Sequence, residues 1–235
     1  GLRQVDVSLH AARPETHDAL SRSPGAWAET CAGLCNLTAL QGMGRQVTSS
    51  VTTLLLAETL PELEALGALL RDIGLRSWRL KYAHGALGCG SENDPNAYIL
   101  PYREVIPDLK RALDAHDQAL SISVHDVPLC LLGDLLLSST DDDEHGVAQY
   151  GETGVKEVLR VTGHWGETSA RCDACVAREA CCKISPAYAQ RWGDEELQPF
   201  DEQTYAAAQA ASELRQRRSS RSRAASPRAE PASPQ

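Results

Sequence analysis

The alternation of strand-like and helix-like segments over the first 130 residues constrains the fold more than any other feature. Strand patterns, with polar and apolar residues alternating or β-branched residues in a run, occupy residues 5–9, 47–56, 77–82 and 120–127. Apolar residues recur at helical spacing in the segments between them, at 24–42, 63–74 and 102–116. Strands that alternate with helices are typical of a parallel sheet covered by helices, so we expect an α/β fold.

Local signals set the expected boundaries of these elements. We expect a polar turn over residues 10–23, with Ser23 as an N-cap and Pro24 in the first helical position. The run from Thr59 to Glu62 fits a capping box, and Gly74 stands where a helix-ending glycine belongs. Pro107 is expected to bend or restart the helix that contains it.

The pattern changes after about residue 130, which divides the chain into three parts. Residues 1–129 form the α/β part, 130–203 a Cys-rich module, and 204–235 a tail. The acidic run 141–144 is expected to be a solvated loop. Residues 204–214 are Ala-rich and predict a helix, whereas the last twenty residues contain mainly Ser, Arg, Ala and Pro and are expected to be disordered.

Charge and hydropathy exclude some classes of protein. The net charge is −9, and because residues 213–235 carry +4, the rest of the chain carries −13. A body this acidic argues against nucleic acid as a partner. No run approaches 18 apolar residues, so we expect no membrane span. The start at Gly1 has neither an initiator Met nor a signal peptide, so we expect a cytoplasmic protein and a chain cut from a longer one.

Four of the eight cysteines fall within eleven residues, as C-x2-C-x5-C-C from Cys172 to Cys182. Without a secretory signal, this cluster favours a metal or iron–sulfur site over a disulfide framework. The C-x2-C turn lets two thiolates converge, and five intervening residues can return a third. We therefore expect Cys172, Cys175 and Cys181 as ligands. Cys130, which follows the fourth strand, is the best candidate for the fourth ligand.

Other interpretations of the cysteines and histidines remain open. A structural zinc site uses the same turn, and buried thiols or an adventitious disulfide are further alternatives. Cys31 and Cys35 are expected to be core residues of one helix, while Cys89 and Cys182 have no assignment. The histidines in loops are expected to be ordinary polar turn residues; they are His10, His17 and His84.

Three stretches of the chain together resemble radical S-adenosylmethionine enzymes with a C-terminal auxiliary-cluster domain of the SPASM or twitch type. Residues 5–10, followed by His17-Asp18 and Pro24-Gly25, resemble the fourth barrel strand and its helix. Residues 47–80 resemble the fifth strand, fifth helix and sixth strand. Residues 172–199 resemble the auxiliary-cluster tail and are the most specific part. The resemblance implies a partial (β/α) barrel from about strand four onward, followed by the cluster module.

The resemblance also implies cofactors and site residues. An auxiliary [4Fe-4S] cluster would be bound by Cys130, Cys172, Cys175 and Cys181. In such barrels polar residues at the C-terminal ends of strands four to six touch S-adenosylmethionine, and by motif position the candidates here are Ser8, Thr52 and Arg79. In the full-length enzyme a second [4Fe-4S] cluster would cleave S-adenosylmethionine to a radical that abstracts a hydrogen atom from a peptide or small-molecule substrate. A ferredoxin- or flavodoxin-like protein would be the reductant.

The chain departs from the family pattern at several positions. The C-x3-C-x2-C motif of the catalytic cluster is absent: Thr38 stands where a third Cys would follow Cys31 and Cys35. We therefore expect the chain by itself to be inactive. Lys183 replaces a frequent Gly, and Ser185 replaces a Cys, which favours one auxiliary cluster. Two alternatives follow: a non-catalytic iron–sulfur scaffold or electron-transfer partner, or a zinc-stabilised α/β binding domain.

Overall fold

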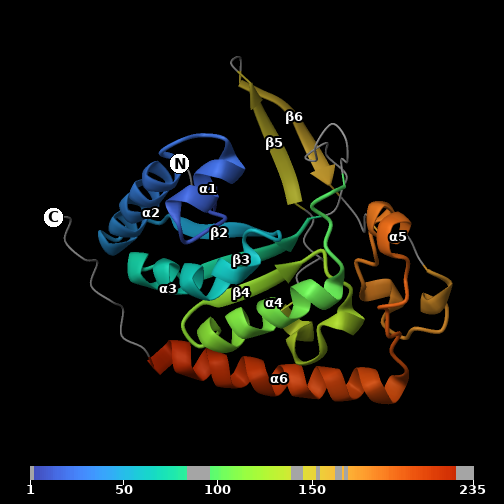
Figure 1. Ribbon diagram of the computed structural model, residues 1–235. Helices are drawn as coiled ribbons and strands as arrows, with labels where there is room; N and C mark the ends of the chain where they lie inside the picture. Colours follow the sequence, from blue (N-terminus) through green and yellow to red (C-terminus); the bar gives the residue numbers. More distant parts are fainter. Residues whose placement is uncertain are drawn as a thin grey trace.

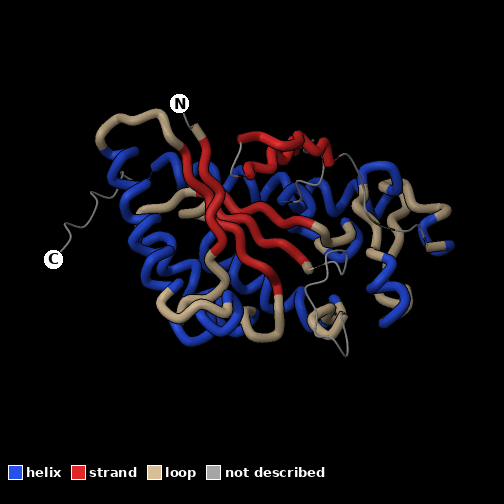
Figure 2. The backbone as a smooth tube through the Cα atoms, turned by 90° about the horizontal axis from the view of Figure 1, so that it is seen from above, coloured by secondary structure: helices blue, strands red, loops and turns tan. Residues whose placement is uncertain are grey.

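The computed structural model describes residues 3–83, 96–138, 145–151, 154–161, 166 and 169–225, with the backbone alone at 145–151, 154–161 and 225. Its centre is a four-stranded parallel sheet of β1 (Gln4–Ser8), β2 (Thr48–Leu55), β3 (Ser77–Tyr82) and β4 (Ser121–His125), in the order β1-β2-β3-β4 (Figures 1 and 2). The expected α/β class and the four predicted strands are confirmed.

Helices cover one face of this sheet. They are α1 (Pro14–Ser21) and α2 (Ala26–Gly42) between β1 and β2, the short η1 (Leu60–Glu62) with α3 (Leu63–Ile73) between β2 and β3, and α4 (Tyr102–His116) between β3 and β4. Because each strand pairs with the next one along the chain and such crossovers are right-handed, successive helices fall on the same side. Pro107 lies inside α4, which continues through it.

The core lies between the helices and this face of the sheet. Trp78, Leu80 and Tyr82 alternate along β3 and are fully buried, and Val51 and Leu55 occupy the matching positions of β2. The helices supply leucines at helical spacing, such as Leu66 and Leu70 of α3 and Leu109 and Leu113 of α4. The period-two burial of the strands therefore fixes which side chains point away from the helices.

The opposite face of the sheet is polar. Its side chains come from the alternate positions of the four strands and include Asp6, Ser8, Ser50, Thr52, Arg79, Lys81, Ser123 and His125. Parallel sheets are usually apolar on both faces because helices cover both. This face therefore lacks the composition that helix packing requires, and it is suited to polar groups.

Beyond β4 the described chain forms short 3-10 turns, a β-hairpin and further helices (Figure 1). Two 3-10 turns, η2 (Leu129–Leu131) and η3 (Gly133–Ser138), precede an antiparallel hairpin of β5 (His145–Gly151) and β6 (Gly154–Val161), which the sequence did not predict. The Cys-rich segment holds η4 (Ala170–Cys172), η5 (Arg178–Ala180) and α5 (Pro186–Trp192). The final helix, α6 (Glu202–Ala225), runs along the bottom of the molecule.

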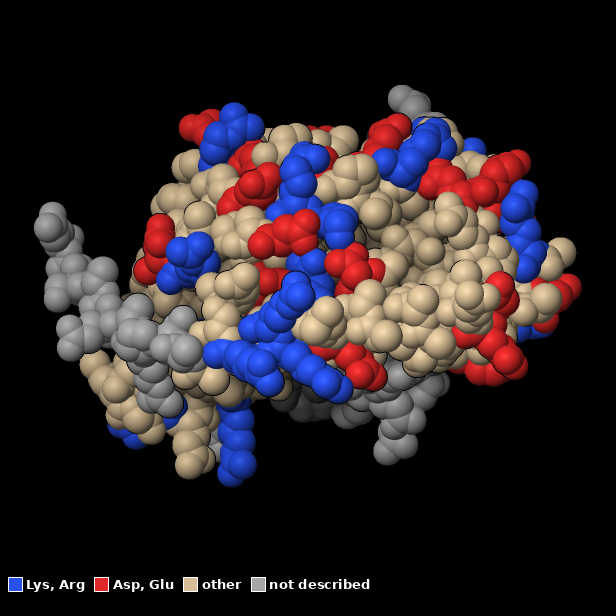
Figure 3. Space-filling view, turned by 90° about the horizontal axis from the view of Figure 1, so that it is seen from below, with Lys and Arg blue, Asp and Glu red and all other residues tan. Residues whose placement is uncertain are grey.

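Helix α6 is longer than the sequence indicated. The prediction of a helix over 204–214 and disorder over the last twenty residues is wrong for residues 216–225, which continue the helix. The reason is an ionic contact: Arg215 lies 2.7 Å from both Asp114 and Asp117 and 3.2 Å from Asp134. Figure 3 shows this underside, where Lys and Arg side chains form a band beside Asp and Glu.

Two local predictions near the first strands are wrong. Residues 14–21 of the expected polar turn form α1, and α2 begins at Ala26 behind Gly25 rather than behind Ser23. No capping box forms at Thr59, because its hydroxyl bonds the backbone of Leu54 and Leu56 instead. Glu62, the partner expected in that box, instead accepts a hydrogen bond from Arg13, the residue before α1.

None of the helices in the residues described above is both long and apolar enough to span a membrane. The acidic run 141–144, Cys89 and His84 lie outside the described residues, as do 226–235.

Candidate metal centre and sheet face

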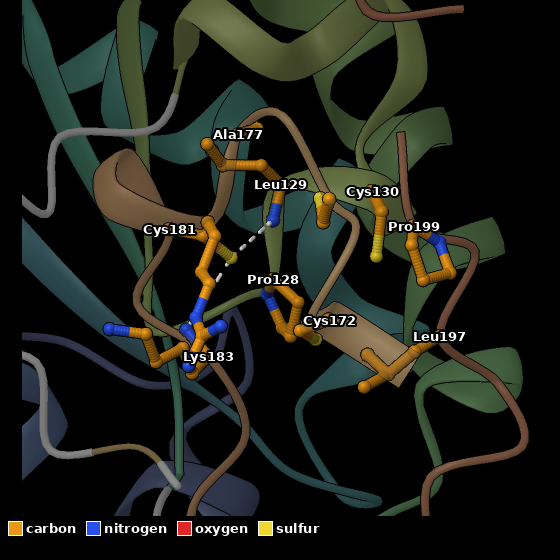
Figure 4. Close-up of a pocket in the computed structure, with 11 residues that line it drawn as sticks. Pro128, Leu129, Cys130, Cys172, Ala177, Cys181, Lys183, Leu197 and Pro199 are labelled. Carbon is orange, nitrogen blue, oxygen red and sulfur yellow. Dashed lines mark hydrogen bonds between the residues drawn. The ribbon is translucent and has the colours of Figure 1, made fainter. Parts of the chain in front are cut away.

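The four cysteines expected as ligands line one pocket, although they come from two distant segments (Figure 4). Cys130 lies in η2, directly after β4, and Cys172, Cys175 and Cys181 lie in the Cys-rich segment. The other lining residues are Pro128, Leu129, Ala177, Arg178, Lys183, Leu197 and Pro199. Most of this wall is apolar, so water competes little for the sulfur atoms.

Backbone amides point at the sulfur atoms. The N–H groups of Leu129 and Lys183 both donate to Cys181 Sγ at 3.4 Å, and the N–H of Phe200 donates to Cys175 Sγ at 3.4 Å. The backbone at Gln198 and at Ser169 bonds to the thiols of Cys130 and Cys172. Such donors favour the deprotonated sulfur, which is the form that binds metals.

The thiols interact with one another electrostatically. Burial, together with the thiols of Cys181, Cys172 and Cys175, raises the pKa of Cys130 to about 11. Burial and the thiols of Cys175 and Cys181 likewise raise the pKa of Cys172, against a smaller opposing effect of Arg178. In the metal-free chain these groups are therefore neutral at pH 7, and a metal would have to displace their protons.

Among the residues described, no three or more His, Cys, Asp or Glu side chains are spaced to hold one metal ion. A single zinc ion and a four-iron cluster both use thiolate ligands, so the choice between them rests on metal analysis.

The three residues expected to touch S-adenosylmethionine lie side by side on the polar sheet face. Ser8 pairs in register with Thr52, Thr52 with Arg79, and Arg79 with Ser123. These four residues form one row across all four strands. A sequence motif alone could not establish that they share a row, because register depends on how the strands pair.

Arg79 has an incomplete set of partners. Its Nη1 lies 3.4 Å from a carboxylate oxygen of Asp6, which also accepts a hydrogen bond from Ser50. Its Nε is buried and has no hydrogen-bond partner among the residues that the structure describes. A buried donor without an acceptor is costly.

The loops that follow β1 and β2 are joined by a carboxylate that the sequence analysis did not identify. Glu62, 5% exposed, accepts hydrogen bonds from the Arg13 backbone at 2.9 Å, from Arg13 Nε at 2.9 Å and Nη2 at 2.8 Å, and from Thr16 Oγ1 at 2.5 Å. This contact fixes α1 beside the ends of the strands that carry Ser8 and Thr52. It spans 49 residues, so no local pattern could have revealed it.

His10 and His17 are not ordinary turn residues, contrary to expectation. His17 lies buried in α1, and its Nδ1 accepts a hydrogen bond from the His10 backbone at 3.2 Å. His10 Nδ1 accepts from the Leu54 backbone at 3.3 Å. Burial, with a smaller contribution from His17, lowers the pKa of His10 to about 4, so its ring is neutral at pH 7.

The other three described cysteines do not line the pocket. Cys31 packs against the core, as expected, but Cys35 is exposed on α2, which corrects its assignment as a core residue. A helix places residues four apart on neighbouring turns, and here the apolar stripe includes only the first. Cys182 is buried and donates to its neighbour's carbonyl at 3.4 Å.

Aromatic and ionic contacts hold the Cys-rich segment against the sheet domain. The rings of Tyr102 in α4 and Tyr188 in α5 stack with centroids 4.3 Å apart. Trp192 Nε1 donates to the Ile99 carbonyl at 2.9 Å, and the Arg103 backbone donates to Glu196 at 2.8 Å. Ser185, which stands where a fuller motif would have Cys, caps α5 through the Tyr188 N–H. These contacts fix three of the cysteines relative to Cys130.

No family model matches this chain, and no curated protein matches it.

Proposed function

We propose that this chain is the C-terminal part of a radical S-adenosylmethionine enzyme that holds an auxiliary [4Fe-4S] cluster and modifies a peptide or small-molecule substrate by hydrogen abstraction. The ligands of the auxiliary cluster are Cys130, Cys172, Cys175 and Cys181. Residues 1–129 correspond to the later strands of the (β/α) barrel, and residues 130–203 to the cluster module.

The observation that carries the proposal is the convergence of four thiols, from segments more than 40 residues apart, on one pocket with backbone N–H donors. Buried thiols that only fill space would not need donors aimed at their sulfur atoms. A disulfide would need two of the sulfurs bonded, whereas these four cysteines are all free thiols. When bound, the cluster supplies a one-electron redox centre.

The sheet supports the enzyme part of the proposal. Sequential strand order with helices on one face is the arrangement of a (β/α) barrel wall. Ser8 ends β1, whereas Thr52 and Arg79 lie within β2 and β3 in the same row of the polar face. In this assignment Ser8 and Thr52 donate hydrogen bonds to S-adenosylmethionine. Arg79, through its unpartnered Nε, binds one of its oxygen atoms.

The ligands of the catalytic cluster are not among these residues, because the sequence contains no C-x3-C-x2-C motif. Catalysis therefore requires a segment that supplies this motif, and a ferredoxin- or flavodoxin-like protein would provide electrons. We expect the 235 residues by themselves to bind the auxiliary cluster without cleaving S-adenosylmethionine.

The test is metal analysis of the chain after anaerobic reconstitution with iron and sulfide. We expect a brown protein with about four iron atoms and four acid-labile sulfides per chain. Each of the variants Cys130→Ser, Cys172→Ser, Cys175→Ser and Cys181→Ser should lose most of this iron. Cys35→Ser is the matched control, because its thiol is exposed on α2, away from the pocket.

Three results would contradict the proposal in whole or in part. Zinc without iron or sulfide, after anaerobic purification, would identify a zinc-stabilised domain instead. Full iron content in Cys130→Ser would show that the fourth ligand is a different residue. A chain that binds the cluster but never supports radical chemistry, even with the missing motif supplied, would favour the iron–sulfur scaffold or electron-transfer partner.

A further inference from the structure

We propose that Arg178 and Lys183 raise the reduction potential of the cluster held by the four cysteines. This inference rests on the proposed function, since it requires a cluster in the pocket. It concerns what two neighbouring cations do to that cluster. Neither residue is a proposed ligand: Arg178 lies between Cys175 and Cys181, and Lys183 follows Cys182.

The charges around the pocket have one sign. Among the described residues that line it, Arg178 and Lys183 are the charged ones, and no carboxylate is in the wall. The remaining lining residues are apolar apart from the thiols themselves. In such a low-dielectric wall a fixed charge acts strongly on a buried redox centre.

Arg178 is one of the residues that line the pocket. Its Nη1 lies 3.2 Å from Asp173, but the Asp173 side chain is 68% exposed and that of Arg178 only 38%. Water therefore screens the carboxylate more than the guanidinium, and a net positive charge remains beside the pocket.

Lys183 stands in an unusual backbone conformation. Its φ of 66° lies in the left-handed region, which glycine adopts without strain and lysine does not. This conformation turns its N–H toward Cys181 Sγ. Glycine would provide the same N–H without this strain. Figure 4 shows that side chain extending outward from the sulfurs, and no described acidic group pairs with it.

The sign of the effect follows from the charge of the cluster. Four thiolates give an iron–sulfur cluster a net negative charge, and one-electron reduction makes it more negative. A nearby cation therefore stabilises the reduced state more than the oxidised state, which raises the potential. Arg178 should contribute more than Lys183 because the ammonium of Lys183 is directed away from the sulfurs.

The experiment is a redox titration of the reconstituted chain with dithionite and mediators, followed by electron paramagnetic resonance. We expect Arg178→Gln to lower the midpoint potential and Lys183→Gly to lower it by less. A tenfold change in the ratio of reduced to oxidised cluster corresponds to 59 mV for one electron. Arg178→Lys, which keeps the charge, should restore most of the potential.

Arg171→Gln is the control, because Arg171 precedes Cys172 but pairs with Asp194 at 3.3 Å and does not line the pocket. Unchanged or higher potentials in Arg178→Gln and Lys183→Gly, with normal iron content, would overturn the inference and leave the proposed function intact. Absence of iron and sulfide from the unmodified chain would instead reject the proposed function. Lys183→Gly keeps the inference testable if Arg178→Gln assembles no cluster, since glycine suits the local backbone.

Discussion

Replacement of Glu62 by Gln tests whether the carboxylate between the first two strand ends stabilises the fold. Glu62 Oε1 accepts from Arg13 Nε, Arg13 Nη2 and Thr16, and Oε2 accepts from the Arg13 backbone. An amide has one acceptor oxygen, so its NH2 group must face at least one of these donors. Glu62→Gln therefore loses a hydrogen bond and leaves a buried donor unpaired.

The expected cost follows from these contacts. A hydrogen bond to a charged group contributes about 1.5–3 kcal/mol, but the Arg13 side chain is 69% exposed, so water screens its share. We expect Glu62→Gln to lower the free energy of unfolding by about 2 kcal/mol. In a chain of this size that is a fall in Tm of about 4–8 °C. Urea unfolding followed by circular dichroism measures the same difference.

The pH dependence provides a second, independent check. Burial raises the pKa of Glu62, but hydrogen bonds from Arg13 and Thr16 outweigh it, so the pKa lies below its ordinary value of 4.5. The stabilisation is therefore complete above pH 4.5 and is lost as the pH falls through the lower, folded-state value. The difference between Glu62→Gln and the unmodified chain should shrink over that interval.

Glu58→Gln, an exposed carboxylate four residues earlier, is the control and should unfold like the unmodified chain. Equal midpoints for Glu62→Gln and Glu58→Gln at pH 7 would refute the reasoning. So would a difference that stays constant down to pH 3.

Three further predictions concern other parts of the molecule. The neutral, half-buried His10 should cost stability as the pH falls below 6.5 toward 4, and His10→Asn should reduce that loss in an acid titration of unfolding. Arg215→Ala should destabilise the docking of α6 by about 1–3 kcal/mol in urea unfolding, whereas Arg217→Ala, 72% exposed, should change it by less than about 0.5 kcal/mol. Metal loading at Cys130 should release protons, measurable in a weakly buffered solution, and should weaken as the pH falls.

The sequence was sufficient to predict the strands, and it nominated the four cysteines that line one pocket, because both signals are local patterns. The alternation in Ser77–Tyr82 and the C-x2-C turn each occupy a few neighbouring residues. Cys130 could be nominated because a residue after a parallel strand lies at the sheet's carboxyl edge. That four thiols line one pocket, however, depends on the packing of Tyr102 against Tyr188.

The failures of prediction have a common physical origin in distant contacts. Residues 216–225 have the composition of a disordered tail, yet they extend α6. In this helix Arg215 forms ion pairs with three aspartates that lie 81 to 101 residues earlier in the chain. Glu62 follows the local spacing of a capping box, but Arg13 competes successfully for its carboxylate. The same limit applies to the row of Ser8, Thr52 and Arg79, which only strand register could reveal.

The position of α6 has a consequence for biosynthesis. Its first turn follows Phe200, whose N–H bonds Cys175, and farther along Ser212 and Gln216 bond the backbone of Leu137 in η3, the turn that follows Cys130. The helix and the residue before it thus contact both segments that carry the four pocket-lining cysteines. Since α6 is translated after every one of these cysteines, all four leave the ribosome before the helix that contacts both of their segments. Under the proposed function, a cluster bound by all four thiols would therefore be inserted after α6 has emerged.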